Sequence, residues 1–164
     1  MLELQRLEAT IHQSIPPHKN IITLYRTYET PEWLFLVLEY CPGQDLYYWL
    51  EQAHDVDGES EEAAQAIMFR QTCEAVQFCH DRGIAHRDLK PENLIVYDRR
   101  GELEQQAVIV KLTDFGLATA DAECRDFSCG SRPYMSPECH LNLSESYDPF
   151  QADVWSLGIV LLNM

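Results

Sequence analysis

The sequence lacks the features that would place it outside the class of ordinary globular proteins. Its 164 residues contain no repeat, no low-complexity linker and no secretory signal. The apolar run over residues 154–164 is too short to span a bilayer, so it predicts a buried helix. Hydrophobic residues make up 46% of the chain and aromatic residues 10%, which is typical of a folded domain with its own core.

Basic residues are scarce. Lys and Arg number 12 against 27 Asp and Glu, which gives a formal net charge of −15. Phosphate backbones and anionic lipids repel such a chain, so we expect neither a nucleic acid nor a membrane as its partner. A solvated acidic surface accounts for the charge, and selection of a basic partner is the alternative.

Cysteine pairs with the spacing of a metal site are also missing. The six cysteines form no C-x-x-C pair and match no zinc pattern; they are Cys41, Cys73, Cys79, Cys124, Cys129 and Cys139. We therefore expect reduced thiols in an intracellular protein that resides in the cytoplasm, the nucleus or both.

Helix and strand signals are mixed along the chain. Apolar residues at helical spacing and helix-ending signals predict helices over residues 2–14, 45–52, 61–82 and 150–164. Apolar runs bounded by turn residues predict strands over residues 21–28, 33–39, 94–97 and 108–113. The polar insert around Arg99-Arg100-Gly101 predicts an exposed hairpin extension. Residues 117–135 show no period and predict a long functional loop.

One short segment carries most of the chemical information. Residues 86–93 read His-Arg-Asp-Leu-Lys-Pro-Glu-Asn and place a carboxylate, an ammonium group and a carboxamide in one loop. Asp88 can accept the proton of a hydroxyl group, Lys90 can neutralise charge on a transferring phosphate, and Asn93 can hold a magnesium ion. Phosphoryl transfer to a hydroxyl group needs all three.

Two further motifs follow this loop. Asp114-Phe115-Gly116 comes first and Ser136-Pro137-Glu138 second. Any one triplet alone fits an ordinary surface loop. The set in this order and spacing resembles the catalytic core of the eukaryotic protein kinases, and a lysine two residues after Asp88 resembles the serine/threonine type. The resemblance covers nearly the whole chain.

The resemblance implies an α+β fold of the bilobal protein kinase type, present in part. Residues 1–39 would be the remnant of the small lobe and residues 40–164 an incomplete large lobe. No glycine-rich phosphate loop and no strand lysine precede Glu8, and the last predicted helix stops at Met164. We therefore expect a chain that is truncated at both ends and that is inactive and marginally stable in isolation.

The resemblance also assigns roles in the reaction. Asp88 would be the catalytic base, with a buried structural acid as the alternative. Lys90 would act on the transferring phosphate. Asn93 and Asp114 would hold Mg²⁺, which prefers hard oxygen ligands. His86 resembles a core packing residue rather than a catalytic one.

Contacts to ATP would come from four other residues. Backbone groups of Glu39 and Cys41 resemble the hinge that bonds the adenine edge, and an ordinary strand end is the alternative. Asp45 resembles the acid that meets a ribose hydroxyl group, and an acid at a helix N-terminus is equally open. Glu8 resembles the glutamate that pairs with a phosphate-binding lysine, with a solvated surface glutamate as the alternative.

Further residues would support the catalytic loop. Ser131 resembles the hydroxyl that bonds the catalytic Asp and Lys, and Asp153 resembles the acid that holds the backbone of the loop. Arg87 resembles the arginine that, in many kinases, pairs with a phosphorylated activation loop. The usual phosphorylation position holds Phe127 in this chain, and we expect the neighbouring Asp126 to supply negative charge there.

The implied function is that of a serine/threonine protein kinase. Such an enzyme transfers the γ-phosphoryl group of ATP to Ser or Thr hydroxyls of a protein substrate, with Mg²⁺ as cofactor. Residues 127–139 are similar to a fungal branch linked to nutrient and meiotic control. The alternative is a non-catalytic kinase-like regulatory or binding module, or an inactive fragment. The presence of Asp88, Lys90, Asn93 and Asp114 favours the enzyme, because a module without chemistry has no need of all four.

Overall fold

The computed structural model describes residues 2–52, 58–98, 108–127, 129–141 and 145–164. Its larger elements are α1 (Leu2–Ser14), β1 (Leu24–Glu29), β2 (Leu34–Leu38), β3 (Gln44–Asp45), α2 (Leu46–Gln52), α3 (Gly58–His80), β4 (Leu94–Asp98), β5 (Val108–Leu112), α4 (Pro137–Leu141) and α5 (Pro149–Leu162). Two short 3-10 turns are η2 (Pro91–Asn93) and η3 (Arg132–Tyr134). The mixture of separate helices and antiparallel strands confirms the α+β class.

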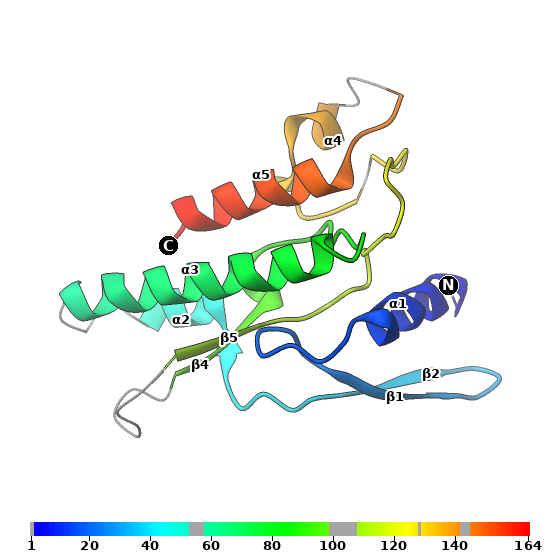
Figure 1. Ribbon diagram of the computed structural model, residues 1–164, viewed down its shortest axis with the longest axis horizontal. Helices are drawn as coiled ribbons and strands as arrows, with labels where there is room; N and C mark the ends of the chain where they lie inside the picture. The colour runs from blue at the N-terminus through cyan, green and yellow to red at the C-terminus, as the bar shows by residue number, and fades with distance from the viewer. Residues whose placement is uncertain (1, 53–57, 99–107, 128, 142–144) are drawn as a thin grey trace.

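The strands form two antiparallel sheets (Figure 1). In the first, β1 and β2 make a hairpin whose turn is closed by a hydrogen bond from the amide of Thr30 to the carbonyl of Trp33. In the second, β4 lies between β3 and β5. The segment before β1 joins the two sheets, because Asn20 accepts from the amide of Leu112 and Ile22 donates to the carbonyl of Leu112.

Helix α3 organises the larger part of the molecule. It packs on β5, and α5 runs antiparallel beside it (Figure 1). Its inner face buries Met68, Ala75 and Cys79 almost completely. Gly83 follows the helix with a φ of 68°, a left-handed conformation that glycine adopts without a steric penalty. The chain therefore turns sharply into the loop of residues 84–93, which contains Asp88.

The predicted apolar faces are buried less fully than expected in two helices. Leu4 and Leu7 of α1 are exposed, whereas Ile11 and Ile15 on the same stripe are buried. Ile67 of α3 is also exposed, although it follows the helical spacing of the apolar residues in this helix.

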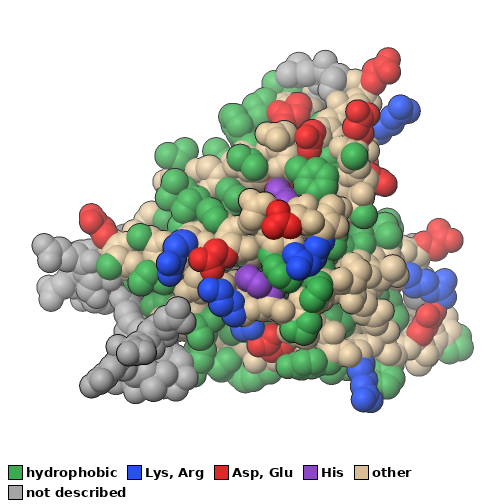
Figure 2. Space-filling model, in the orientation of Figure 1, with side chains coloured by type: hydrophobic (Ala, Val, Ile, Leu, Met, Phe, Trp, Pro, Cys, Tyr) green, Lys and Arg blue, Asp and Glu red, His purple; other side chains and the backbone are tan. Residues whose placement is uncertain are grey.

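Helix α5 is central to the core on one side only. Val160 is fully buried, and Ala152 and Ser156 lie on the same side. Val154, Trp155, Leu161 and Leu162 are exposed, and Figure 2 shows hydrophobic side chains at the surface where α5 lies. The expectation of a helix buried all round is therefore wrong.

The polar insert, the cysteines and the apolar run near the C-terminus were also subjects of sequence-based expectations. The polar insert around Arg99-Arg100-Gly101 lies outside the described residues. All six cysteines are free thiols, in agreement with the prediction from their spacing. Among the described residues, no helix combines the length and the hydrophobicity that crossing a membrane requires.

Candidate active site

The loop of residues 84–93 is held in place by a carboxylate near the start of α5. Asp153 is fully buried, and its two carboxylate oxygens accept hydrogen bonds from the backbone amides of His86, over 2.8 Å, and Arg87, over 2.7 Å. The contact expected for Asp153 is therefore confirmed. His80, at the end of α3, adds a third hydrogen bond to this carboxylate over 2.8 Å. Nothing in the sequence pattern indicated this histidine.

The side chains of the loop converge on Asp88. The ammonium group of Lys90 donates to Oδ2 of Asp88 over 2.7 Å and to the hydroxyl of Ser131 over 2.9 Å. Ser131 in turn donates to Oδ1 of Asp88 over 2.9 Å. Burial raises the pKa of Asp88, but these hydrogen bonds outweigh burial and bring the pKa below its ordinary value. Asp88 is therefore ionised at neutral pH and can accept a proton.

Asn93 and Asp114 lie next to this cluster. The buried carboxamide of Asn93 donates from Nδ2 to the backbone carbonyl of Asp88 over 2.9 Å. Its Oδ1 accepts no hydrogen bond from a described residue. The backbone carbonyl of Asn93 accepts from the amide of Thr113 over 3.0 Å, which brings the following Asp114 alongside. Asp114 has a left-handed φ of 62°, a strained conformation for a residue with a side chain.

Glu8 of α1 faces Asp114 across Gly116. A Cβ atom on Gly116 would lie 3.1 Å from Oδ1 of Asp114 and 3.6 Å from Oε2 of Glu8. Burial, and then the charge of Asp114, raises the pKa of Glu8. No lysine or arginine of the described residues lies within ion-pair distance of Glu8. Two carboxylates in this arrangement favour the binding of a cation.

A row of rings connects α1 to the loop of residues 84–93. Phe115 is fully buried between His12, with ring centroids 4.6 Å apart, and His86, with centroids 5.1 Å apart. The position of His86 in the core confirms its predicted packing role. His12 was not identified from the sequence, although it lies four residues after Glu8 and so on the same side of the helix.

The predicted hinge residues follow β2. The amide of Glu39 donates to the carbonyl of Thr23 over 2.8 Å, so only the Glu39 carbonyl is left for a ligand. No described residue accepts a hydrogen bond from the amide of Cys41. The Glu39 side chain pairs with Lys111 over 2.7 Å. Burial opposes ionisation of Glu39, but Lys111 and Thr23 prevail and lower its pKa. The sequence pattern did not indicate this ion pair.

Asp45 immediately precedes α2. Its Oδ1 accepts from the amide of Tyr48 over 2.8 Å, so the alternative of an acid at a helix N-terminus is confirmed. Oδ2 has no hydrogen-bond donor among the described residues and could still accept from a hydroxyl group. Asp45 therefore serves the helix whether or not it also meets a ligand.

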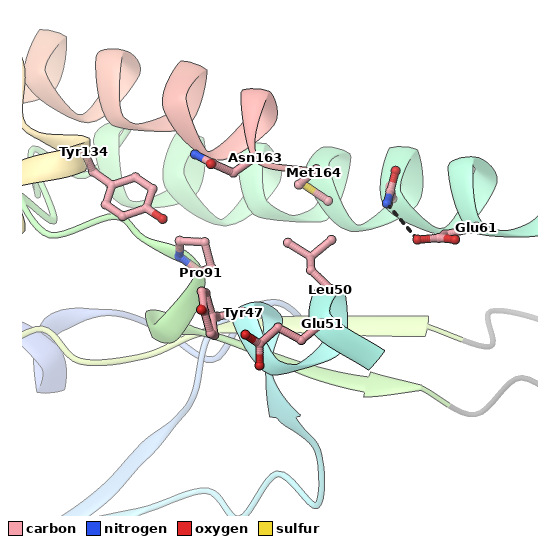
Figure 3. Close-up of a pocket in the computed structure, with 9 residues that line it drawn as sticks. Tyr47, Leu50, Glu51, Glu61, Pro91, Tyr134, Asn163 and Met164 are labelled. Carbon is pink, nitrogen blue, oxygen red and sulfur yellow. Dashed lines mark hydrogen bonds between the residues drawn. The ribbon is translucent and has the colours of Figure 1, made fainter. Parts of the chain in front are cut away.

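A cavity of about 270 Å³ adjoins the loop at Pro91 (Figure 3). Tyr47, Leu50 and Glu51 of α2 form one side of it, and Glu61 and Gln65 of α3 with Tyr134, Asn163 and Met164 form the rest. Burial, and then the charge of Glu92, raises the pKa of Tyr134. The lining contains no lysine or arginine.

Comparison with known proteins agrees with this geometry. A family model described as "Protein kinase domain" matches residues 3–164. The chain belongs to the protein kinase family. The described fold is accordingly part of a kinase fold.

Several kinases resemble the chain over nearly its whole length. It is 37% identical to the "Negative regulator of sexual conjugation and meiosis" of Schizosaccharomyces pombe, over 99% of this chain and 37% of that protein. It is 38% identical to "Serine/threonine-protein kinase chk1" of the same organism, over 96% of this chain and 29% of that protein. For "Serine/threonine-protein kinase ksp1", identity is 36% over 98% of this chain and 34% of that protein.

The relatives bear on the length of the chain and on its branch of the family. The chain spans about a third of their length. The similarity to a fission-yeast relative concerned with conjugation and meiosis confirms the resemblance to a fungal branch. The kinase family generally uses ATP and Mg²⁺. The division of the chain into lobes at residue 39 stays a prediction.

Proposed function

We propose that the protein is a serine/threonine protein kinase that transfers the γ-phosphoryl group of ATP to hydroxyl groups of a protein substrate. The hydrogen-bonded cluster of Asp88, Lys90 and Ser131 carries this proposal. Its members come from two segments more than 40 positions apart, so folding has assembled a base, a cation and a hydroxyl at one point. A lysine two residues after the base favours serine and threonine over tyrosine as acceptors.

The base and the lysine have separate tasks in this proposal. An ionised Asp88 accepts the proton of the substrate hydroxyl as the hydroxyl oxygen attacks. Lys90 is fixed by Asp88 and Ser131, and its positive charge is available to the transferring phosphate. Catalysis of this kind depends on positioning and on charges that are already in place, which a rigid cluster supplies.

The residues present fit a magnesium ion bound together with ATP. Magnesium takes one or two protein oxygens and completes its shell with phosphate and water. Asp114 and Oδ1 of Asn93 would supply these oxygens. Among the described residues, no group of three or more His, Cys, Asp or Glu residues could hold a metal ion by itself. When bound, magnesium ATP supplies the transferable phosphoryl group.

The remaining contacts to ATP are assigned by position. The carbonyl of Glu39 and the amide of Cys41 would bond the adenine edge, and the second oxygen of Asp45 would accept from a ribose hydroxyl group. Glu8 would pair with a lysine that binds phosphate. The neighbourhood of Glu8 and Asp114 supports this role, because a cation between them would relieve their repulsion.

Replacement of Asp114 by alanine tests the proposal. In the full-length protein that contains these residues, Asp114→Ala should abolish phosphorylation of a generic substrate while leaving thermal unfolding cooperative, because a metal ligand is lost but no core side chain. Asp121→Asn, on the same segment, is the matched control and should retain activity. A folded Asp114→Ala variant with normal turnover would exclude the magnesium assignment. A folded wild-type protein that binds ATP without transferring phosphate would favour a non-catalytic module.

A further inference from the structure

Arg87 carries a guanidinium group that is almost fully buried beside the reaction centre. Its side chain is 10% exposed. Nε donates to the carbonyl of Leu117 over 2.6 Å, and Nη1 donates to the two carboxylate oxygens of Asp126 over 2.7 and 2.8 Å. Nη1 also donates to the hydroxyl of Tyr147 over 3.3 Å. A cation removed from water in this way requires an anion beside it, because its lost hydration is otherwise uncompensated.

Asp126 meets this requirement. In the described part of the chain it is the one carboxylate within ion-pair distance of Arg87. Burial raises the pKa of Asp126, but hydrogen bonds from Arg87 and Cys129 outweigh burial and hold the pKa below its usual value. The thiol of Cys129 donates to Oδ2 over 3.1 Å. Asp126 therefore carries a full negative charge at neutral pH.

The ion pair is directly connected to the catalytic base. Arg87 precedes Asp88 in the chain and has a left-handed φ of 66°, and its amide is fixed by Asp153. A non-glycine residue keeps such a conformation only where several contacts hold it. If the guanidinium group loses its anion, the contacts that fix the backbone immediately before Asp88 are weakened.

The segment that carries Asp126 meets the catalytic loop at a second point. A Cβ atom on Gly130 would lie 2.8 Å from the carbonyl oxygen of Arg87, so glycine is required for this close approach. The next residue, Ser131, bonds both Asp88 and Lys90. Asp126 and Ser131 thus fasten the same segment to the loop, one at Arg87 and the other at Asp88.

We propose that Asp126 is a positioning residue that holds Arg87, and through it Asp88, in the active arrangement without a phosphate group on residues 117–135. A guanidinium group donates hydrogen bonds to carboxylate oxygens as it does to phosphate oxygens, so an encoded acid can take the place of a modification. The following residue, Phe127, packs against the ring of Tyr147 with centroids 5.6 Å apart, and so it also contributes to docking the segment. The proposal rests on the proposed kinase function.

The test uses the full-length protein after exhaustive phosphatase treatment, with mass spectrometry to verify that residues 117–135 carry no phosphate. We expect the treated wild type to keep its activity within about twofold. Asp126→Asn should lower kcat at least about tenfold and change the KM for ATP less than about threefold, because the charge acts on positioning and not on nucleotide contacts. Asp126→Glu should restore most of the activity, and the control Asp121→Asn should match the wild type.

Two further measurements separate positioning from general stability and from failure of the kinase assignment. If Asp126 acts through Arg87, the variant Arg87→Ala with Asp126→Asn should lose no more activity than Arg87→Ala alone. Amide hydrogen exchange at residues 117–127 should accelerate in Asp126→Asn even if no substrate is turned over. Loss of activity on dephosphorylation, full activity of Asp126→Asn, additive losses in the double variant, or unchanged exchange would each overturn the proposal.

Discussion

Lys90 is the residue whose contribution should appear mainly in the transition state. It is held by Asp88 and Ser131 before any substrate binds, so its charge is already in place when negative charge develops on the transferring group. We expect Lys90→Met to lower kcat by about 10²–10³-fold and to change the KM for ATP by less than about threefold. Steady-state kinetics at varied ATP concentration measure both quantities.

The control for this variant is Lys19→Met, which removes a lysine from an exposed ion pair with Glu74. Exposed pairs contribute little, so its kinetics and its unfolding temperature should stay close to those of the wild type. Equal losses of ATP affinity and turnover in Lys90→Met would contradict the assigned role.

His12 should make the fold sensitive to mild acid. Its ring is buried against Phe115, and Nε2 lies 2.7 Å from the carbonyl oxygen of Ile22. Burial lowers the pKa of His12, while the hydrogen bond to Ile22 acts in the opposite direction and the nearby His86 lowers the pKa further. Because the folded pKa lies below the unfolded value of about 6.5, protonation favours the unfolded chain. The stability from neutral His12 is present above that pH and is lost as the pH falls toward the folded pKa.

Thermal unfolding between about pH 7.5 and pH 5.5 tests this sensitivity. We expect the unfolding temperature of the wild type to fall more steeply over this range than that of His12→Gln, which keeps a hydrogen-bond donor but does not titrate. His140→Gln replaces an exposed histidine of α4 and should leave the wild-type slope unchanged. His18, whose pKa is also lowered, is expected to leave a residual slope in His12→Gln. Identical slopes for the wild type and His12→Gln would refute the prediction.

At the scale of elements, two glycines have opposite roles. Gly43 lies against β4 so closely that a Cβ atom would sit 2.0 Å from the carbonyl oxygen of Val96. Gly43→Ala should therefore reduce the free energy of unfolding by about 1–3 kcal/mol. Gly158 lies inside α5, and a Cβ atom there would meet nothing within 4 Å apart from its chain neighbours and the backbone of its own helix. Gly158→Ala should therefore raise the free energy of unfolding by about 0.5–1 kcal/mol. Urea denaturation measures both changes, and a shift of the same sign for the two variants would contradict the argument.

The elements themselves could largely be predicted, because each arises from local signals. Apolar spacing within a helix and the turn residues that bound a strand act over a few positions, and the structure has α1, α3, β1 and β2 close to the ranges that were expected. Burial within an element was harder to predict. Ile67 and Met68 are adjacent and equally apolar, and only the position of β5 and α5 against α3 decides which of them is buried.

In the site, too, local features could be predicted from the sequence and contacts between distant segments could not. The motif around Asp88 predicted which residues lie close together, because residues a few positions apart in one short loop must be neighbours. Contacts between distant segments needed the fold: the pair of Glu39 with Lys111, the hydrogen bond of His80 to Asp153, and the contact of Arg87 with Tyr147 join positions that no local pattern relates. The resemblance to kinases predicted the contacts of Ser131 and Asp153, because a family pattern records tertiary structure as well as local chemistry.

At the scale of the whole molecule, net charge and exposed apolar surface act against each other. The chain carries a net charge of −15, which keeps copies apart in dilute salt. It also exposes large apolar side chains on α5, on α1 and on the β1–β2 hairpin, among them Trp155, Leu162, Leu4 and Trp33. Apolar patches of this kind favour association once the repulsion between charges is screened. The salt concentration should therefore decide whether charge repulsion or apolar association prevails.

The last prediction is that residues 1–164, expressed alone, associate as the salt concentration rises. The screening length falls from about 10 Å at 0.1 M to about 3 Å at 1 M, whereas apolar association is not weakened by salt. Sedimentation velocity should show mainly monomer at the lower concentration and larger species at the higher one. Trp155→Glu removes part of the apolar face of α5, and Gln151→Glu adds the same charge to an exposed position of the same helix. Trp155→Glu should stay monomeric in 1 M salt while Gln151→Glu associates like the wild type, because the charge alone is screened there and only the loss of apolar surface remains. Equal association of both variants would show that the face of α5 is not the contact.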